Sequence, residues 1–157
     1  MADAERSDDA GLARLIALEE IRTLKADYFL HTDLQNWDAL ERLFVPGAET
    51  DFRDSVGGPP DESLLMHDPK AFVSNNARVL AGIKTAHFGY MPRFTFREDG
   101  DIEAIWSMED WLWIPDGAAL PPGTMHGFGH YHDRYTRHEG RWKFATTRLT
   151  RIRVDFL

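Results

Sequence analysis

Four side chains that could exchange protons are spread along the sequence: Tyr28 and Asp33 in ADYFLHTD, His87 in TAHFGY and Asp110 in SMEDWLW. A histidine titrates near neutral pH and therefore suits the role of a general base. A carboxylate beside it fixes the imidazole tautomer, and a tyrosine can donate a hydrogen bond to a developing oxyanion. Taken alone, His87 could be a surface or core histidine, and Asp33 a turn or cap residue. Acid/base chemistry requires a fold that brings them together.

Asp110 stands in the middle of an otherwise apolar set of alternating residues. Taking every second position from residue 102 to residue 114, the other members are Ile102, Ala104, Trp106, Met108, Leu112 and Ile114. Successive side chains of a strand point to opposite faces, so these residues share one face, which we expect to be buried. A buried carboxylate needs a hydrogen-bonding or cationic partner, or its pKa rises. Asp110 is therefore expected in a pocket wall, either protonated as a proton donor or ionised as a second partner of His87. The alternative is an edge strand or a bulge that exposes Asp110, or Glu109 beside it, to solvent.

Three helices are expected before any long strand. Apolar residues recur at spacings of three and four over residues 9–31 and predict an amphipathic helix. A short helix over residues 37–44 would begin after the N-cap candidate Asn36 and stop at Pro46-Gly47. After a short strand over residues 48–53 and a loop over residues 54–68, a helix over residues 69–80 would have Asp68 as its N-cap and Pro69 at its first position.

The second half of the chain has the composition of long strands. Four segments, residues 84–97, 101–115, 124–138 and 141–155, are rich in β-branched and aromatic residues and are separated by Gly- and Pro-containing turns. Helices followed by antiparallel strands indicate an α+β domain with the helices on one face of a curved sheet. Such an arrangement would leave a pocket between the helices and the concave face.

The bulk composition restricts the class of protein. A chain of 157 residues with 43% hydrophobic residues fits one globular domain, which we place at residues 9–157, after a flexible polar tail over residues 1–8. The net charge of −8 argues against nucleic-acid or anionic-membrane partners. With no cysteine, thiolate catalysis and disulfides are excluded. The first ten residues lack the pattern of a signal peptide and no run is long enough for a transmembrane helix, so we expect a cytoplasmic protein.

Several strings of the sequence together resemble one family. LEEIRTLKADYFLHTDLQNWDALERLF, TAHFGYMPRF, WSMEDWLW and GHYHDRYTRHEGRWKFATTRLTRI are similar to the SnoaL-like branch of the nuclear-transport-factor-2-like (NTF2-like, cone-fold) superfamily, over about residues 12–155. The similarity is strongest to bile acid 7α-dehydratases and scytalone dehydratase-like proteins. The resemblance implies an α+β cone and a homo-oligomer, commonly a trimer or dimer. It also implies a cofactor-independent dehydratase (a lyase) or isomerase that acts on a small cyclic, largely apolar substrate such as a steroid, polyketide or aromatic catabolite.

The resemblance assigns roles to particular residues. The catalytic positions of the family fall on Tyr28, Asp33, His87 and Asp110, with Asp33 expected to orient His87. A last-strand arginine falls on Arg151 in LTRIR, where it would bind a substrate carboxylate or polar tail, although it could also face solvent.

Other positions would line the pocket, and some of them depart from the family pattern. Phe52 stands where two of the dehydratases have a tyrosine, and Gly129 and Tyr131 stand where scytalone dehydratase has a serine and an asparagine. Phe52, Trp106, Met108 and Tyr131 are expected to contact the substrate. The missing hydroxyl at Phe52 means that substrate identity should not be transferred from these relatives.

Two alternatives compete with this interpretation. His126, His130 and His132 share one strand face, but the downstream glutamate of a cupin-type metal site is missing, so no metal is expected. The same cone could also serve without catalysis, as a ligand-binding module or as the small structural subunit of a ring-hydroxylating dioxygenase.

Overall fold

The protein is described by a computed structural model that covers the backbone of residues 2–157 and the side chains of residues 9–157. Its helices are α1 (Ala2–Asp33), α2 (Trp37–Glu41) and α3 (Pro69–Val79), with a 3₁₀ turn, η1 (Glu62–Leu64). Its strands are β1 (Phe44–Asp51), β2 (Leu65–Met66), β3 (Lys84–Phe96), β4 (Ile102–Ile114), β5 (Gly123–His138) and β6 (Arg141–Phe156).

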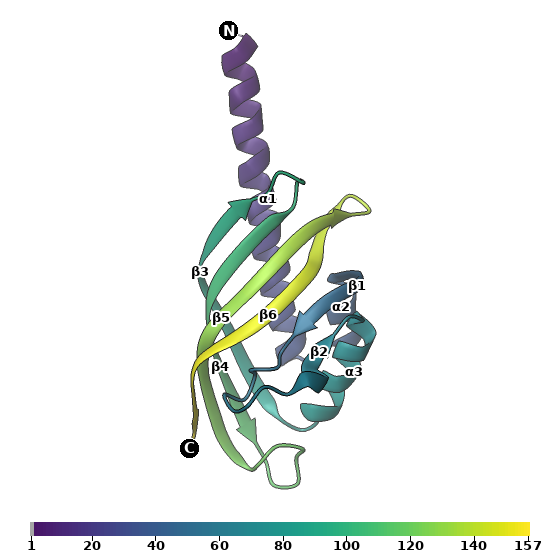
Figure 1. Cartoon of the computed structure of the whole chain (residues 1–157), viewed down its shortest axis with the longest axis vertical. Helices are drawn as coiled ribbons and strands as arrows, with labels where there is room; N and C mark the ends of the chain where they lie inside the picture. The colour runs from purple at the N-terminus through teal and green to yellow at the C-terminus, as the bar shows by residue number, and fades with distance from the viewer. Residues whose placement is uncertain (1) are drawn as a thin grey trace.

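All six strands form one sheet in the order β2-β1-β6-β5-β4-β3. Neighbouring strands are antiparallel except β1 and β6, which are parallel. Figure 1 shows α1 lying along the sheet with its N-terminal end projecting beyond it, while α2, α3, β1 and β2 gather beside the other half of α1. The predicted α+β architecture, with helices on a mostly antiparallel sheet, is confirmed.

The core lies between α1 and the inner face of the sheet. It combines Ile21, Leu24 and Tyr28 of α1 with inner-face residues of β4, β5 and β6. Every member of the predicted alternating set of β4, Asp110 included, is buried. The expectation that this face of β4 is buried is therefore confirmed, and the sheet carries a carboxylate in its inner wall.

Several element boundaries differ from the prediction. The first strand covers Phe44–Asp51 rather than residues 48–53, and the predicted loop over residues 54–68 contains η1 and β2. Helix α1 begins at Ala2 rather than near Asp9, and the predicted flexibility of residues 1–8 lies outside the described side chains. Helix α2 ends at Glu41 rather than near Phe44, and Pro46-Gly47 does not stop it but forms an irregularity inside β1. There Gly47 has a positive φ of 74° and the register with β6 shifts. A Pro-Gly pair is compatible with either a helix stop or a strand bulge, and the pairing with β6 decides between them.

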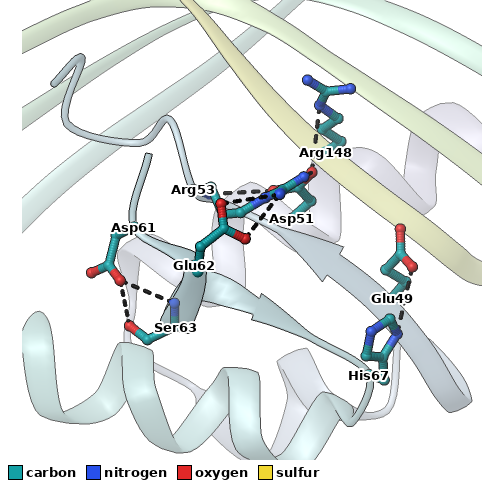
Figure 2. Close-up of polar contacts among 8 residues, drawn as sticks. All are labelled: Glu49, Asp51, Arg53, Asp61, Glu62, Ser63, His67 and Arg148. Carbon is teal, nitrogen blue, oxygen red and sulfur yellow. Dashed lines mark hydrogen bonds and ion pairs between the residues drawn. The ribbon is translucent and has the colours of Figure 1, made fainter. Parts of the chain in front are cut away.

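A long loop between β1 and η1 has a closed neck. The backbone N–H of Phe52 donates to Leu64 and that of Asp61 donates to Arg53. Figure 2 shows the side chains at this neck, where Arg53 donates to Asp51 and to Glu62 at N–O distances of 2.9 and 3.1 Å. The loop is thus held at its base, and farther along it Ser55 and Gly57 lie against Arg151 and Val154 of β6.

Candidate active site

The end of α1 and the start of β3 meet in a hydrogen-bonded pair. Oδ1 of Asp33 lies 2.6 Å from Nδ1 of His87, and Oδ2 accepts the backbone N–H of the same histidine at 3.0 Å. Thr85 donates its hydroxyl to Oδ1 at 2.7 Å. Asp33 therefore orients the imidazole and also caps the open edge of β3, and the predicted neighbourhood of Asp33 and His87 is present in the structure.

The contact with Asp33 fixes which nitrogen of His87 remains available. A carboxylate accepts hydrogen bonds, so Nδ1 carries the proton and Nε2 keeps its lone pair in the neutral ring. The ring of Phe29 is stacked parallel to the imidazole, with centroids 6.3 Å apart. The side chain of His87 keeps only 11% of its surface exposed. This combination gives a partly desolvated imidazole with a fixed tautomer and a free basic nitrogen.

Asp110 lies directly across from His87 on the neighbouring strand and pairs with an arginine. The register of β3 and β4 pairs these two residues. Nη1 and Nη2 of Arg151 donate to the two oxygens of Asp110 at 2.8 and 2.7 Å, and both side chains are buried. Paired hydrogen bonds of this kind join a guanidinium to an ionised carboxylate. The geometry therefore favours the ionised form of Asp110 over the protonated donor.

The same pair changes the expected role of Arg151. Its Nε donates to the carbonyl of Ser55 at 2.8 Å, so the guanidinium joins the loop after β1 to the inner wall of the sheet. Arg151 does not face solvent, and its two terminal nitrogens are occupied by Asp110 rather than open to a substrate carboxylate. The carboxylate in the middle of an apolar face is thus explained by a cation from the last strand.

A glycine on the intervening strand allows this contact. β5 lies between β4 and β6, and Gly127 is the residue paired with Asp110. A methyl group at Gly127 would collide with Nη1 of Arg151 and Oδ1 of Asp110. The glycine thus leaves the space in which the guanidinium crosses β5.

Tyr28 lies beside a buried ion pair that sequence reasoning missed. Nζ of Lys25 lies 2.8 Å from Oδ2 of Asp133, and the lysine is 1% exposed. Burial lowers the pKa of Lys25 to about 8, against the opposing effect of Asp133. Its ammonium lies 3.6 Å from the ring centroid of Tyr131 and 4.8 Å from that of Tyr28. Burial, with a smaller contribution from Asp133, raises the pKa of Tyr28 well above its usual value, so this hydroxyl stays a neutral donor.

A sequence signal for Lys25 and Asp133 did exist. Lys25 is four residues after Ile21 and three before Tyr28, which places it on the apolar face of α1. Asp133 alternates with Tyr131 and Tyr135 on the inner face of β5 in the same way as Asp110 on β4.

The remaining predicted substrate contacts lie in the packed centre of the inner face. Trp106 donates its indole N–H to the hydroxyl of Tyr135, and the ring of Phe52 stacks on Phe72. Met108 contacts Nη1 of Arg151 through its sulfur, and Tyr131 is 1% exposed. These residues form the wall that was predicted, but the wall is filled by side chains rather than open.

Open space adjoins Asp33 at the edge of the sheet, where the end of α1 meets the start of β3. A cleft of about 470 Å³ is lined by Asp33, Leu34, Gln35, Ile83, Lys84, Thr85 and Trp113. A larger cleft of about 1080 Å³ lies between α1, α2 and the β5–β6 turn and contains none of the predicted site residues. Asp33 lines the smaller cleft, whereas Tyr28, His87 and Asp110 are not among the residues that line it. In the described part of the chain, no three His, Asp or Glu side chains converge as a metal site would require.

Comparison with known proteins places the chain in a family. Residues 13–148 match the SnoaL-like domain. The chain belongs to the SnoaL-like domain family. This SnoaL-like fold also matches hexachlorocyclohexane dehydrochlorinase LinA-type3 from Novosphingobium barchaimii, with a TM-score of 0.76 and 19% identity over 94% of both chains.

Two further solved structures share the SnoaL-like fold. A putative scytalone dehydratase from Novosphingobium aromaticivorans matches with a TM-score of 0.74 and 16% identity, over 96% of this chain and 91% of the other. A putative aromatic ring hydroxylase from the same organism matches with a TM-score of 0.75 and 15% identity, over 91% and 94%. These likenesses show the NTF2-like cone. Within residues 2–157, none of the helices has the length and apolar character needed to cross a membrane.

Proposed function

We propose that this SnoaL-like protein is a cofactor-independent lyase, in particular a dehydratase, or an isomerase that uses His87 as its general base. The observation that carries the proposal is the 2.6 Å contact between Nδ1 of His87 and Oδ1 of Asp33. It leaves Nε2 of a partly buried imidazole free to accept a proton, with a carboxylate in place to stabilise the imidazolium that results.

The proposed reaction removes a proton next to a carbonyl group. Nε2 of His87 takes the proton as the C–H bond breaks, and the electron pair moves onto the carbonyl oxygen, where Tyr28 is the proposed donor. In a dehydration, the imidazolium returns the proton to the β-hydroxyl as its C–O bond breaks, and water leaves. In an isomerisation, the imidazolium returns the proton to a different carbon. His87 serves as both base and acid, since Asp110 is paired with Arg151.

The proposed substrate is small, cyclic and largely apolar. The cleft beside Asp33 has a volume of about 470 Å³, which is a size typical of small-molecule sites. Leu34, Ile83 and Trp113 give it apolar surface, beside the polar residues Asp33, Gln35, Lys84 and Thr85. The similar proteins named as a dehydrochlorinase and a putative scytalone dehydratase support elimination as the class of reaction.

The test is a screen of cyclic β-hydroxy ketones and acids followed by substitution of the dyad. With any substrate that the wild type turns over, His87→Ala is expected to lower kcat about 10²–10⁴-fold, and Asp33→Asn to lower it by a similar or smaller factor. His67→Ala is the matched control, because His67 is an exposed histidine outside the site. If His87→Ala keeps near wild-type turnover, the mechanism is wrong. Ligands that bind beside His87 and are never converted would instead identify a binding module.

A further inference from the structure

We propose that Lys25 is a positioning residue for the reaction, whose ammonium supports the aromatic rings of Tyr28 and Tyr131 at the candidate site. The proposal rests on the proposed function, in which the hydroxyl of Tyr28 donates to the carbonyl oxygen of the substrate. It assigns a role to a buried cation that the proposed mechanism does not use. Lys25 would not touch the substrate and would act through the two tyrosines instead.

The ammonium of Lys25 lies against a layer of aromatic rings. Its Nζ is 3.6 Å from the ring centroid of Tyr131, 4.8 Å from that of Tyr28 and 5.1 Å from that of Phe29. These rings also contact one another, with centroids 5.7 to 5.9 Å apart. The layer reaches the dyad, because the ring of Phe29 is stacked parallel to the imidazole of His87. The ammonium is therefore one aromatic ring removed from the proposed general base.

The contacts with the two tyrosines have the geometry of cation–π interactions. Both distances are below the ~6 Å at which such interactions operate, and the interactions are strongest when the cation is desolvated. Lys25 is 1% exposed, so this condition is met. Burial, followed by the carboxylate of Asp133, raises the pKa of Tyr28 and weakens its hydroxyl as a donor. A cation beside the ring opposes that effect, because it stabilises negative charge that develops on the phenol oxygen.

A network of hydrogen bonds fixes the position of the ammonium. Nζ of Lys25 donates to Oδ2 of Asp133 at 2.8 Å. The same carboxylate accepts the hydroxyls of Tyr135 at 2.7 Å and of Thr147 at 2.6 Å. The hydroxyl of Tyr135 in turn accepts the indole N–H of Trp106, a predicted substrate contact. A buried network with its members satisfied rigidifies the side chains that it includes, so the cation is held in place behind the rings.

The charge of Lys25 is present at neutral pH and is lost at mildly alkaline pH. Burial lowers the pKa of Lys25 to about 8, against the opposing effect of Asp133. The titratable groups that face the ammonium from α1 and β5 are a carboxylate and three phenols: Asp133, Tyr28, Tyr131 and Tyr135. Burial raises the pKa of each phenol well above its usual value, so the phenols stay neutral in this range. From β6, the ring of Phe144 faces the ammonium and does not titrate.

The first test compares Lys25→Met with the double variant Lys25→Met and Asp133→Asn, on any substrate that the wild type turns over. Lys25→Met is expected to lower kcat about 10-fold while KM changes by less than about 3-fold, because the lost support matters most in the transition state. The double variant removes both buried charges and should recover part of the stability. It still lacks the ammonium, so its kcat should stay low. Lys70→Met is the matched control, since Lys70 is an exposed lysine on α3.

The pH profile of kcat gives a readout that a purely structural role would not change. We expect the kcat of wild type to fall above about pH 8, where Lys25 loses its proton. This alkaline limb should be absent in the double variant. If Lys25→Met does not fold, the double variant carries the comparison alone.

The second test needs no substrate. Nuclear magnetic resonance follows the chemical shifts of the tyrosine Cζ atoms between about pH 6.5 and pH 9.5, below the ordinary range of tyrosine ionisation. The signals of Tyr28 and Tyr131 should move with a midpoint near the pKa of Lys25, about 8. They should not move in the double variant. Tyr90 is the control tyrosine, because it is 44% exposed and bonds to Glu109 instead.

Two results would overturn the proposal. One is a kcat that returns to the wild-type value in the double variant as stability recovers, because Lys25 would then have a purely structural role. The other is a Tyr28 signal that does not move while Lys25 loses its proton. If His87→Ala keeps near wild-type turnover, or if no substrate is turned over, the proposed function fails instead. The Cζ shifts still decide in that case whether the ammonium acts on the rings.

Discussion

Lys25 is a charged side chain in the middle of the core, and its partner decides whether the core tolerates it. Besides Lys25, Asp133 accepts hydrogen bonds from Tyr135 and Thr147. Lys25→Met would leave this carboxylate buried without its cation, and we expect a loss of about 3–5 kcal/mol in the free energy of unfolding. Urea unfolding measures it. The double variant Lys25→Met with Asp133→Asn should recover part of the loss, whereas a single-variant loss below about 1 kcal/mol would contradict this account of the pair.

A substitution at Gly127 tests whether the ion pair of Asp110 and Arg151 depends on the absence of a side chain at this position. We expect Gly127→Ala to displace the guanidinium and to destabilise the protein by about 1–3 kcal/mol, because the added methyl group overlaps both partners. Gly58→Ala is the matched control, since a methyl group at Gly58 meets nothing within 4 Å. Thermal unfolding of the two variants compares them. Equal destabilisation at the two positions would show that the space at Gly127, where the guanidinium of Arg151 passes over β5, is not tightly packed.

The site could be predicted from the sequence only where a local signal existed. The alternation on β4 predicted a buried Asp110, and residue types with the family resemblance predicted that Asp33 and His87 are neighbours. The pairing of Asp110 with Arg151 had no such signal, because it depends on the register of three strands and on the space above Gly127. Lys25 was missed since helix periodicity was read from apolar residues alone.

At the scale of elements, the long strands were predicted to within one residue at each end and the first strand was not. Strands β3 to β6 were predicted from their β-branched and aromatic composition and from the Gly- or Pro-containing turns that separate them. β1 contains Pro46-Gly47, and only its pairing with β6 shows that the chain remains in the sheet there. Non-local pairing of this kind overrides a local turn signal.

The neck of the loop after β1 gives a prediction for an element. Arg53 bridges Asp51 and Glu62 across the neck, so Arg53→Met should loosen residues 54–60 while leaving the sheet intact (Figure 2). Hydrogen exchange should show faster exchange of the backbone amides at the neck, with β4 and β5 unchanged. Arg97→Met is the control, because Arg97 makes similar acidic contacts in the β3–β4 turn instead. Unchanged exchange at the neck in Arg53→Met would show that the backbone hydrogen bonds hold it alone.

For the whole molecule, the buried lysine couples stability to pH. The folded-state pKa of Lys25 is lowered to about 8 from an ordinary value of 10.5. Above pH 8 the folded protein releases a proton that the unfolded chain still binds, so stability should rise with pH. The expected contribution of Lys25 is about 1.4 kcal/mol per pH unit. It can be measured up to about pH 9.5, before tyrosines ionise in the unfolded chain. The difference in the free energy of unfolding between wild type and Lys25→Met, measured with urea at each pH, isolates the contribution of Lys25. A difference that does not change with pH would contradict the lowered pKa.

The molecule as a whole brings the end of α1 to one edge of the sheet, where Asp33 and His87 share a proton at Nδ1 of the imidazole. The most direct measurement is the tautomer of His87 by nitrogen-detected nuclear magnetic resonance at about pH 8, where an ordinary imidazole is neutral, with His87→Gln used to assign its signals. We expect a proton on Nδ1, facing Asp33, and an unprotonated Nε2. A proton on Nε2 would mean that the imidazole has no free basic nitrogen facing the substrate, and would contradict the proposed role of the dyad.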